Sequence, residues 1–222
     1  MIIAFDVNET LLDLRPLDAL FEEAFGNAAL RQQWFARMLQ VAFVGGLTER
    51  YVDFTTAQHA ALTMTARLQG VELADDDAQR IVDSMRTLPA HLDVPDALTR
   101  LKEEGFTLTT LTNSPLDVAR DQMRHAGLAD RFNATLSAHQ VRALKPRREA
   151  YGLVASTFDV ALDEVRLVAA HGWDVTGALA AGCAAAFVAR PGQALIPIGD
   201  QPDIVGDDVA AVVDLVVARD RP

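Results

Sequence analysis

The feature that most constrains the fold of this chain is an alternation of strand-like and helix-like segments that begins near residue 93. Helical spacing of apolar residues fills the intervals, and short runs of β-branched or small apolar residues predict strands at 106–112, 132–137, 165–170 and 184–189. Strands that alternate with helices pair in parallel, because each helix carries the chain back across a face of the sheet. The pattern predicts the α/β class, with a doubly wound parallel sheet and a final helix over 209–217.

The first residues of the chain predict one more strand, and this strand ends in a carboxylate. Residues 1–5 form an apolar run that indicates a strand buried on both faces, and Asp6 interrupts the run. Open α/β sheets bind their ligands at the carboxyl ends of their strands, which is where Asp6 falls. Asp6 could also start an ordinary turn. Thr10, four residues further on, can direct its hydroxyl back toward the Asp6 carboxylate.

Residues 15–92 interrupt the alternation, because their apolar positions recur at helical spacing throughout. Gly45 and Gly46 are expected to end the second helix of this stretch, and Thr48 is expected to cap the third. A helical insertion at the carboxyl end of the first strand would lie over the ligand crevice. We therefore expect a Rossmann-like core of residues 1–14 and 93–222 with an inserted helical cap of residues 15–92.

Charge and composition limit the classes of partner. The net charge is -11, from 20 basic and 31 acidic residues, which disfavours nucleic acid and anionic membranes as partners. No run of 18 apolar residues predicts a membrane span, and no basic segment precedes the apolar start as in a signal peptide. The single cysteine, Cys183, excludes an internal disulfide. These features predict a cytoplasmic protein with a small-molecule substrate.

Three later strand ends also carry polar residues. They are the segments Thr112-Asn113-Ser114, Lys145-Pro146 with Tyr151 beyond it, and His171-Gly172-Trp173-Asp174. Taken singly, each has an ordinary interpretation as a turn, a solvated lysine or a helix cap. In a doubly wound sheet, however, these ends meet Asp6 at one crevice. The sequence therefore predicts a single site that combines two carboxylates, a hydroxyl–amide pair and a lysine.

The residues of this site resemble the haloacid dehalogenase superfamily, and within it the L-2-haloacid dehalogenases. The resemblance covers nearly the whole chain and rests on these matches: Phe5-Asp6 with Thr10-Leu11, Leu111-Thr112-Asn113, Lys145-Pro146 with Tyr151, and Trp173-Asp174. It implies an enzyme that hydrolyses short, anionic 2-haloalkanoic acids to 2-hydroxy acids. It also implies that no cofactor is needed and that a homodimer is possible.

The resemblance implies a covalent mechanism. Asp6 would attack the carbon that bears the halogen and form an ester, while Lys145 offsets its charge and Thr10 and Thr112 orient it. Water activated near Asp174 would then attack the carboxyl carbon of Asp6. The substrate-binding candidates are Val7, Asn8, Phe35, Phe54, Asn113, Tyr151 and Trp173. For Phe35, Phe54 and Trp173, plain core packing is an equally good interpretation.

Two positions separate this chain from the phosphatases that it also resembles. Asn8 stands where those enzymes have an aspartate as general acid, and an amide cannot donate and recover a proton. Ala170 stands at the first acidic position of the loop that binds magnesium in those enzymes. We therefore expect no metal at this site. A phosphatase with altered motifs and a catalytically inactive binding protein stay as alternatives.

The chain also departs from the dehalogenases themselves. Phe35 follows Trp34 where that family has an arginine, and Arg37 lies on a different helix face. The family loop Ser-Ser-Asn-Ala-Trp-Asp has Ala169 in place of its first serine and His171 in place of its asparagine. As a neutral imidazole, His171 is expected to hydrogen-bond the hydrolytic water and to share base duty with Asp174. The replacement for the arginine, the halogen preference, the chain length and the stereospecificity stay open.

Overall fold

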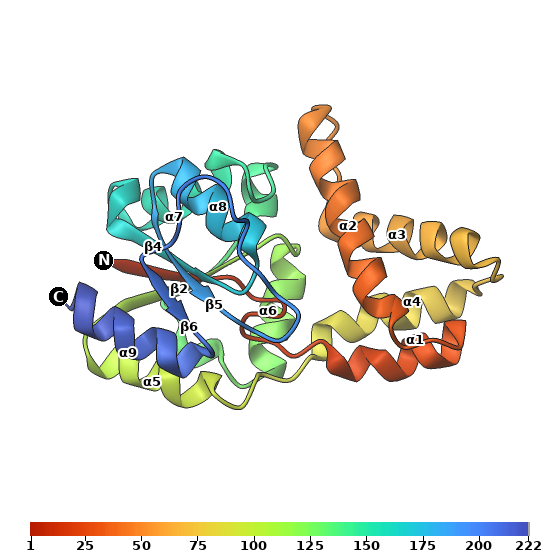
Figure 1. Ribbon diagram of the computed structural model, residues 1–222, viewed down its shortest axis with the longest axis horizontal. Helices are drawn as coiled ribbons and strands as arrows, with labels where there is room; N and C mark the ends of the chain where they lie inside the picture. Colours follow the sequence, from red (N-terminus) through yellow and green to blue (C-terminus); the bar gives the residue numbers. More distant parts are fainter. Residues whose placement is uncertain (222) are drawn as a thin grey trace.

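A computed structural model describes residues 1–221 and has a parallel sheet at its centre (Figure 1). The six strands lie in the order β3-β2-β1-β4-β5-β6, and every pair is parallel. They are β1 Ile2–Phe5, β2 Thr107–Thr112, β3 Ala134–Ser137, β4 Val165–Ala169, β5 Ala184–Val188 and β6 Ile204–Gly206. The doubly wound parallel sheet is thus confirmed, and β6 is a strand that the sequence did not predict. The strand order reverses at β1, so Asp6 follows the strand where ligands of such sheets bind.

Helices cover both faces of the sheet. Helices α5 and α9 lie along one face, and α7 and α8 lie on the other (Figure 1). Their bounds are α5 Val94–Glu103, α6 Leu116–His125, α7 Arg148–Phe158, α8 Gly172–Ala181 and α9 Val209–Asp220, with short 3-10 turns η3 Ala129–Arg131, η4 Ala138–Val141 and η5 Leu162–Glu164. Side chains of β1 alternate between the two cores: Ile3 and Phe5 face one, and Ile2 and Ala4 the other. Both faces of this strand are therefore buried, as its uninterrupted apolar run predicts.

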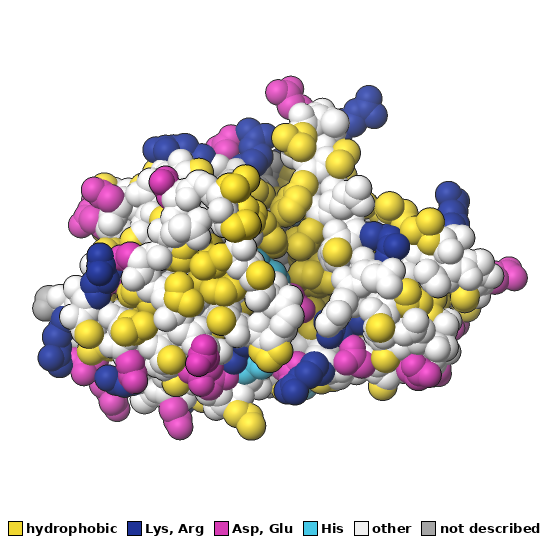
Figure 2. All heavy atoms as spheres, viewed as in Figure 1, with side chains coloured by type: hydrophobic (Ala, Val, Ile, Leu, Met, Phe, Trp, Pro, Cys, Tyr) yellow, Lys and Arg dark blue, Asp and Glu magenta, His cyan; other side chains and the backbone are white. Residues whose placement is uncertain are grey.

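A helical group follows β1 and lies beyond the carboxyl ends of the strands (Figure 1). It consists of η1 Arg15–Leu17, α1 Asp18–Phe25, α2 Leu30–Leu47, α3 Phe54–Gln69, α4 Asp75–Ser84 and η2 Met85–Thr87. Figure 2 shows a cleft between this group and the sheet, with hydrophobic side chains along it. The division into a cap of residues 15–92 and a core stays a prediction.

The chain enters and leaves the helical group through two segments that pair with each other. The backbone N–H of Asp13 donates to the carbonyl of Pro89 at 2.9 Å, and that of His91 donates to the carbonyl of Leu11 at 2.9 Å. Leu12 and Ala90 form an antiparallel bridge between the two bonds. The two connections are thus one short ribbon. Within residues 1–221, no helix is long and apolar enough to cross a membrane.

The expected boundary at Gly45 and Gly46 is wrong. Helix α2 continues through both glycines to Leu47, and α3 is capped by Asp53, whose carboxylate accepts from the backbone N–H of Thr56 at 2.9 Å. A Cβ atom at Gly45 would lie 2.8 Å from the carbonyl oxygen of Arg50. Gly45 is therefore needed for the close return of the chain after the helix, which the helical pattern itself does not reveal. A helix tolerates one glycine at a cost of about 1 kcal/mol.

Gly177 and Gly152 should respond in opposite ways to alanine. A Cβ atom at Gly177 in α8 would overlap with Pro146 and with the hydroxyl of Tyr151, whereas Gly152 in α7 has open space around it. We expect Gly177→Ala to lower the free energy of unfolding by about 1–3 kcal/mol through overpacking. Gly152→Ala should raise it by about 0.5–1 kcal/mol, because alanine favours the helix. Urea unfolding of both variants measures this, and equal effects would contradict the packing argument.

Candidate active site

Asp6 is held in a buried loop at the end of β1. Its backbone N–H donates to the carbonyl of Val168 at 3.0 Å, which extends the pairing with β4 by one residue. The hydroxyl of Thr10 donates to Asp6 Oδ2 at 2.8 Å and accepts from the backbone N–H of Ala170 at 2.9 Å. The carbonyl of Val7 accepts from the backbone N–H groups of Leu11 at 2.9 Å and Leu12 at 3.1 Å. The carboxylate therefore has a fixed direction at the sheet edge.

Lys145 connects Asp6 to the second carboxylate of the site. Its ammonium donates to Asp6 Oδ1 at 2.8 Å and to Asp174 Oδ2 at 2.6 Å, and the lysine is 1% exposed. Asn113 bonds both sides of the Lys145 backbone, accepting from its N–H at 2.8 Å and donating to its carbonyl at 3.2 Å. Asn113, which we expected to bind substrate, thus holds the lysine in place. Tyr151 similarly donates its hydroxyl to Asp174 Oδ1 at 2.7 Å.

These contacts shift the ionisation of the three charged groups. Burial alone would raise the pKa of Asp6, but the charge of Lys145 and a hydrogen bond from His171 more than offset this and lower the pKa well below its ordinary value. Burial, opposed by Lys145 and reinforced by the charge of Asp6, raises the pKa of Asp174. Burial would lower the pKa of Lys145, but Asp174 and Asp6 raise it. Asp6 is therefore an ionised carboxylate next to an ammonium at neutral pH.

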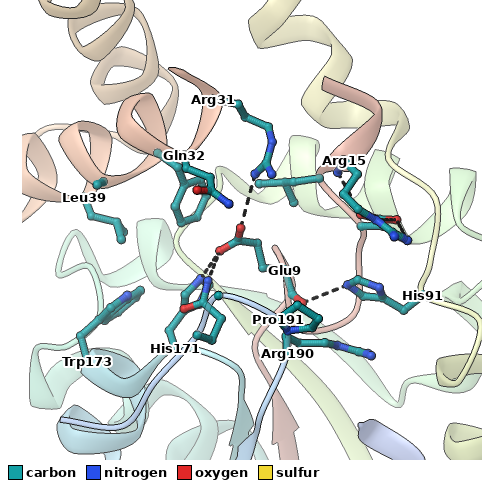
Figure 3. Close-up of a pocket in the computed structure, with 16 residues that line it drawn as sticks. Glu9, Arg15, Arg31, Gln32, Leu39, His91, His171, Trp173, Arg190 and Pro191 are labelled. Carbon is teal, nitrogen blue, oxygen red and sulfur yellow. Dashed lines mark hydrogen bonds and ion pairs between the residues drawn. The ribbon is translucent and has the colours of Figure 1, made fainter. Parts of the chain in front are cut away.

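His171 lies between two carboxylates, and neither of them is Asp174. Its Nδ1 is 2.9 Å from Asp6 Oδ2. Its Nε2 is 2.9 Å from Glu9 Oε2, and Figure 3 shows this contact. Burial alone would lower the pKa of His171, but hydrogen bonds to Asp6 and Glu9 and their charges raise it to about 9. The expected neutral imidazole beside Asp174 is therefore wrong. In the free enzyme this ring is a cation at neutral pH.

A cavity of about 510 Å³ opens beside His171, between the sheet edge and α2 (Figure 3). The ring of Phe35 stacks on His171 with centroids 5.6 Å apart, and Trp173 stacks on it at 5.4 Å. Both aromatic residues line the cavity, so they lie where a substrate wall was predicted. Arg31 from α2 also lines it. The pocket therefore combines an apolar wall with cationic side chains and with the carboxylates of Glu9 and Asp13.

Other predicted residues lie around this centre without facing the cavity. Phe54 is buried among core side chains, and Val7 is fully buried. The side chain of Asn8 accepts from Gln122 at 3.0 Å and donates to Ser114 Oγ at 3.4 Å. The Thr112 hydroxyl accepts from the backbone N–H of Ser114 at 3.2 Å. Within residues 1–221 it makes no hydrogen bond to Asp6, so the expected orienting contact is absent and Thr112 shapes its own loop instead.

The sequence analysis missed Glu9 and Arg31. Arg31 lies four residues before Phe35 and therefore on the same face of α2. This spacing in the sequence indicates an arginine that can reach the position next to Phe35. The side chain of Arg31 is buried, and Nη1 lies 3.5 Å from Glu9 Oε1. Arg37, by contrast, faces Gln33, at 3.4 Å between Nη1 and the amide oxygen. No pattern in the neighbouring sequence indicates that Glu9 belongs to the site, because the direction of its side chain depends on the backbone conformation of the loop.

Comparison with known proteins agrees with this geometry. The family model of haloacid dehalogenase-like hydrolases matches residues 1–182. The (S)-2-haloacid dehalogenase of Pseudomonas sp. (strain YL) is 30% identical over 215 residues, which cover 96% of this chain and 93% of that protein. Haloacetate dehalogenase H-2 of Moraxella sp. (strain B) is 28% identical over 216 residues, covering 96% of each protein.

The structure of L-2-haloacid dehalogenase from Xanthobacter autotrophicus has the same architecture. It matches with a TM-score of 0.90 at 26% identity and covers 99% of this chain and 100% of that one. The fold and the match over most of the chain define the class: this chain belongs to the haloacid dehalogenase-like hydrolases. The resemblance found in the sequence is thereby confirmed.

The raised pKa of His171 predicts a pH-dependent contribution to stability. Its value of about 9 lies above the ordinary value of 6.5, so the protonated ring stabilises the folded state fully below pH 6.5. This stabilisation is lost as pH rises from 6.5 through 9, and it amounts to about 3 kcal/mol. Urea unfolding of wild type and His171→Asn at pH 6 and pH 9 measures it. The wild-type advantage should shrink at pH 9, whereas exposed His125→Asn should leave the pH dependence unchanged.

Proposed function

We propose that this hydrolase removes halide from short 2-haloalkanoic acids and gives 2-hydroxy acids through an ester on Asp6. The arrangement of the Asp6 carboxylate is the observation that carries the proposal. Lys145 binds one of its oxygens, and Thr10 and His171 bind the other. His171 also lines the cavity, so the carboxylate lies directly behind a residue of the cavity wall. An ionised carboxylate in a fixed direction is suited to nucleophilic attack.

The first half-reaction needs positioning more than proton transfer. An oxygen of Asp6 bonds to the carbon that bears the halogen, and the halide leaves with the electron pair of the broken bond. Halide is a stable anion, so no acid must protonate it. Holding nucleophile and carbon in line can contribute about 7–11 kcal/mol to lowering the barrier. The bonds of Asp6 to Lys145 and Thr10 supply this fixed geometry.

The cavity suits a small monocarboxylate. Phe35 and Trp173 offer an apolar wall for the alkyl chain and the halogen. Arg31 offers positive charge for the carboxylate, since its buried Nη1 has no hydrogen-bond partner within residues 1–221. Such a substrate carries less charge than a phosphate ester and needs fewer cations. This combination supports a short haloacid as the substrate class.

The second half-reaction is the hydrolysis of the ester. Water attacks the carboxyl carbon of Asp6, and the ester oxygen leaves as the hydroxyl of the product. Asp174, the base expected from the sequence, has both oxygens engaged, one by Lys145 and the other by Tyr151. Its side chain is also fully buried. These contacts support a role for Asp174 in holding Lys145.

The same contacts argue against a phosphatase. Asn8, at the position of the phosphatase general acid, is held by Gln122 and Ser114. The ammonium of Lys145 lies between Asp6 and Asp174, so a cation of the protein already bridges the two carboxylates that a metal would need. A haloacid substrate therefore fits the site better than a phosphate ester.

Asp6→Asn should abolish chloride release from (S)-2-chloropropionate, because an amide cannot form the ester. A chloride electrode measures the release, and exposed Asp163→Asn is the matched control that should keep wild-type activity. A single turnover of wild type in heavy-oxygen water should put the label into Asp6. Label that enters the hydroxy acid directly would contradict the covalent route.

Chloride release should not depend on a divalent metal. We expect the rate to stay unchanged after dialysis against a chelator, because Lys145 supplies the charge next to Asp6. Hydrolysis of small phosphate esters, assayed in parallel with and without magnesium, should be negligible. Magnesium-dependent phosphate release without chloride release would instead support the phosphatase alternative.

A further inference from the structure

Glu9 holds an unusual backbone conformation and a central position in the site. Its φ angle is 60°, in the left-handed region, which costs residues with a side chain on the order of 1 kcal/mol or more. The loop directs its carboxylate to three separate segments. Oε2 accepts from His171 Nε2 at 2.9 Å and from Gln193 Nε2 at 2.8 Å, and Oε1 lies 3.5 Å from Arg31 Nη1. Glu9 is therefore fixed as tightly as the nucleophile.

The ring of His171 is fixed by Glu9 and by stacking. Phe35 and Trp173 stack on it with interplanar angles of 15° and 26°. With Nε2 bound to Glu9, Nδ1 faces Oδ2 of Asp6 at 2.9 Å. One ring nitrogen thus faces the reacting carboxyl group and the other faces a supporting carboxylate. An imidazole that acts as a general base needs this arrangement.

The charges around the ring change during the proposed reaction. Asp6 and Glu9 face it directly. The next charged groups are Lys145 beyond Asp6 and Asp174 beyond Lys145. On the other side, Arg31 follows Glu9 and is paired in turn with Asp18. The wall of the same cavity also holds four charged or titratable residues, Asp13, Arg15, His91 and Arg190. Alkylation makes Asp6 neutral and removes one of the two anions that retain the ring proton. Burial favours the neutral ring, and only Glu9 then opposes it.

We propose that His171, oriented by Glu9, takes the proton of the hydrolytic water, and that it can do so only after Asp6 has been alkylated. This inference rests on the proposed function, because it assigns the base for hydrolysis of the Asp6 ester. Glu9 is a positioning residue in this scheme. Asp174 holds Lys145, and its side chain is fully buried.

The two steps balance in atoms and protons. When the bond from Asp6 to carbon forms and the halide leaves, the Nδ1 proton of His171 passes to solvent. Water then bonds to the carboxyl carbon of Asp6, and one of its protons goes to Nδ1. The bond from this carbon to the ester oxygen breaks, and that oxygen takes the second proton. Haloacid and water thus give hydroxy acid, halide and one proton, and Asp6 and His171 return to their starting charges.

Single-turnover kinetics can separate the two steps. Enzyme in excess over (S)-2-chloropropionate is quenched at intervals, chloride is counted, and mass spectrometry measures the ester on the Asp6 peptide. His171→Asn introduces the asparagine that the dehalogenases have at this position of the loop. This variant should still release chloride but accumulate the ester. We expect its hydrolysis to slow by about 10²-fold to 10⁴-fold, the range for loss of a general base. Asp174→Asn should slow both steps together, because it disturbs Lys145.

The pH profile of ester hydrolysis tests the role of Glu9. In wild type the rate should rise with pH through one ionisation, and in His171→Asn this ionisation should disappear. Glu9→Gln keeps an oxygen that can accept from Nε2 but removes the charge. In this variant the ionisation of His171 should therefore move to lower pH. The maximal rate of ester hydrolysis should fall by about 10-fold, a small effect for a general base. A purely structural role of Glu9 would lower the rate without moving the ionisation.

Three outcomes would overturn the inference. Unchanged ester lifetime in His171→Asn, with a normal chloride burst, refutes His171 as the base. Ester that accumulates only in Asp174→Asn returns that role to Asp174. Wild type that releases no chloride and forms no adduct with any haloacid overturns the proposed function itself, and the inference with it.

Discussion

The buried ammonium of Lys145 is the constraint on which the rest of the site depends. An ammonium that is 1% exposed is stable only if opposite charges and hydrogen bonds replace the water that it has lost. Asp6 and Asp174 provide both, and removal of either one would leave a buried charge without its partner. Asn113 and Tyr151 then fix the lysine and the second carboxylate in turn. Much of the polar interior thus holds one cation beside the Asp6 carboxylate.

The same principle extends outward from Lys145 toward the cavity. Formal charges alternate along a connected series that lies at the carboxyl edge of the sheet: Asp174, Lys145, Asp6, His171, Glu9 and Arg31. Each interior member has an opposite charge on both sides, and Arg31 is paired further with Asp18 of α1. A reaction that neutralises the third member must therefore alter the balance at its neighbours. In the proposed reaction, alkylation of Asp6 is therefore coupled to the protonation of His171.

The sequence predicted the parts of this arrangement that depend on chain topology. Asp6, Lys145 and Asp174 follow or flank strands, and a parallel sheet brings strand ends together whatever the details of packing. The sequence did not predict which side chains hydrogen-bond to one another, because these pairs depend on the direction of each side chain. Asn113 and Tyr151 were expected on substrate and instead hold Lys145 and Asp174. Glu9 reaches His171 only because its backbone is left-handed, and no residue pattern announces that conformation at a glutamate. The continuation of helix α2 through Gly45 was also missed. That glycine is required by the close approach of the Arg50 carbonyl, which the sequence pattern does not reveal.

The paired segments around Leu12 and Ala90 have a mechanical consequence. Within residues 1–221, the chain passes between the helical group and the sheet only through these two segments, and they lie side by side. Any swing of the helices must therefore turn about this one ribbon, which acts as a pivot. His91 on the outgoing segment also contacts the carbonyl oxygen of Glu9 through Nε2 at 3.1 Å. His91 thus connects the paired segments to the loop that carries Glu9, so a rotation of the helical group about these segments would also displace the residue that orients His171.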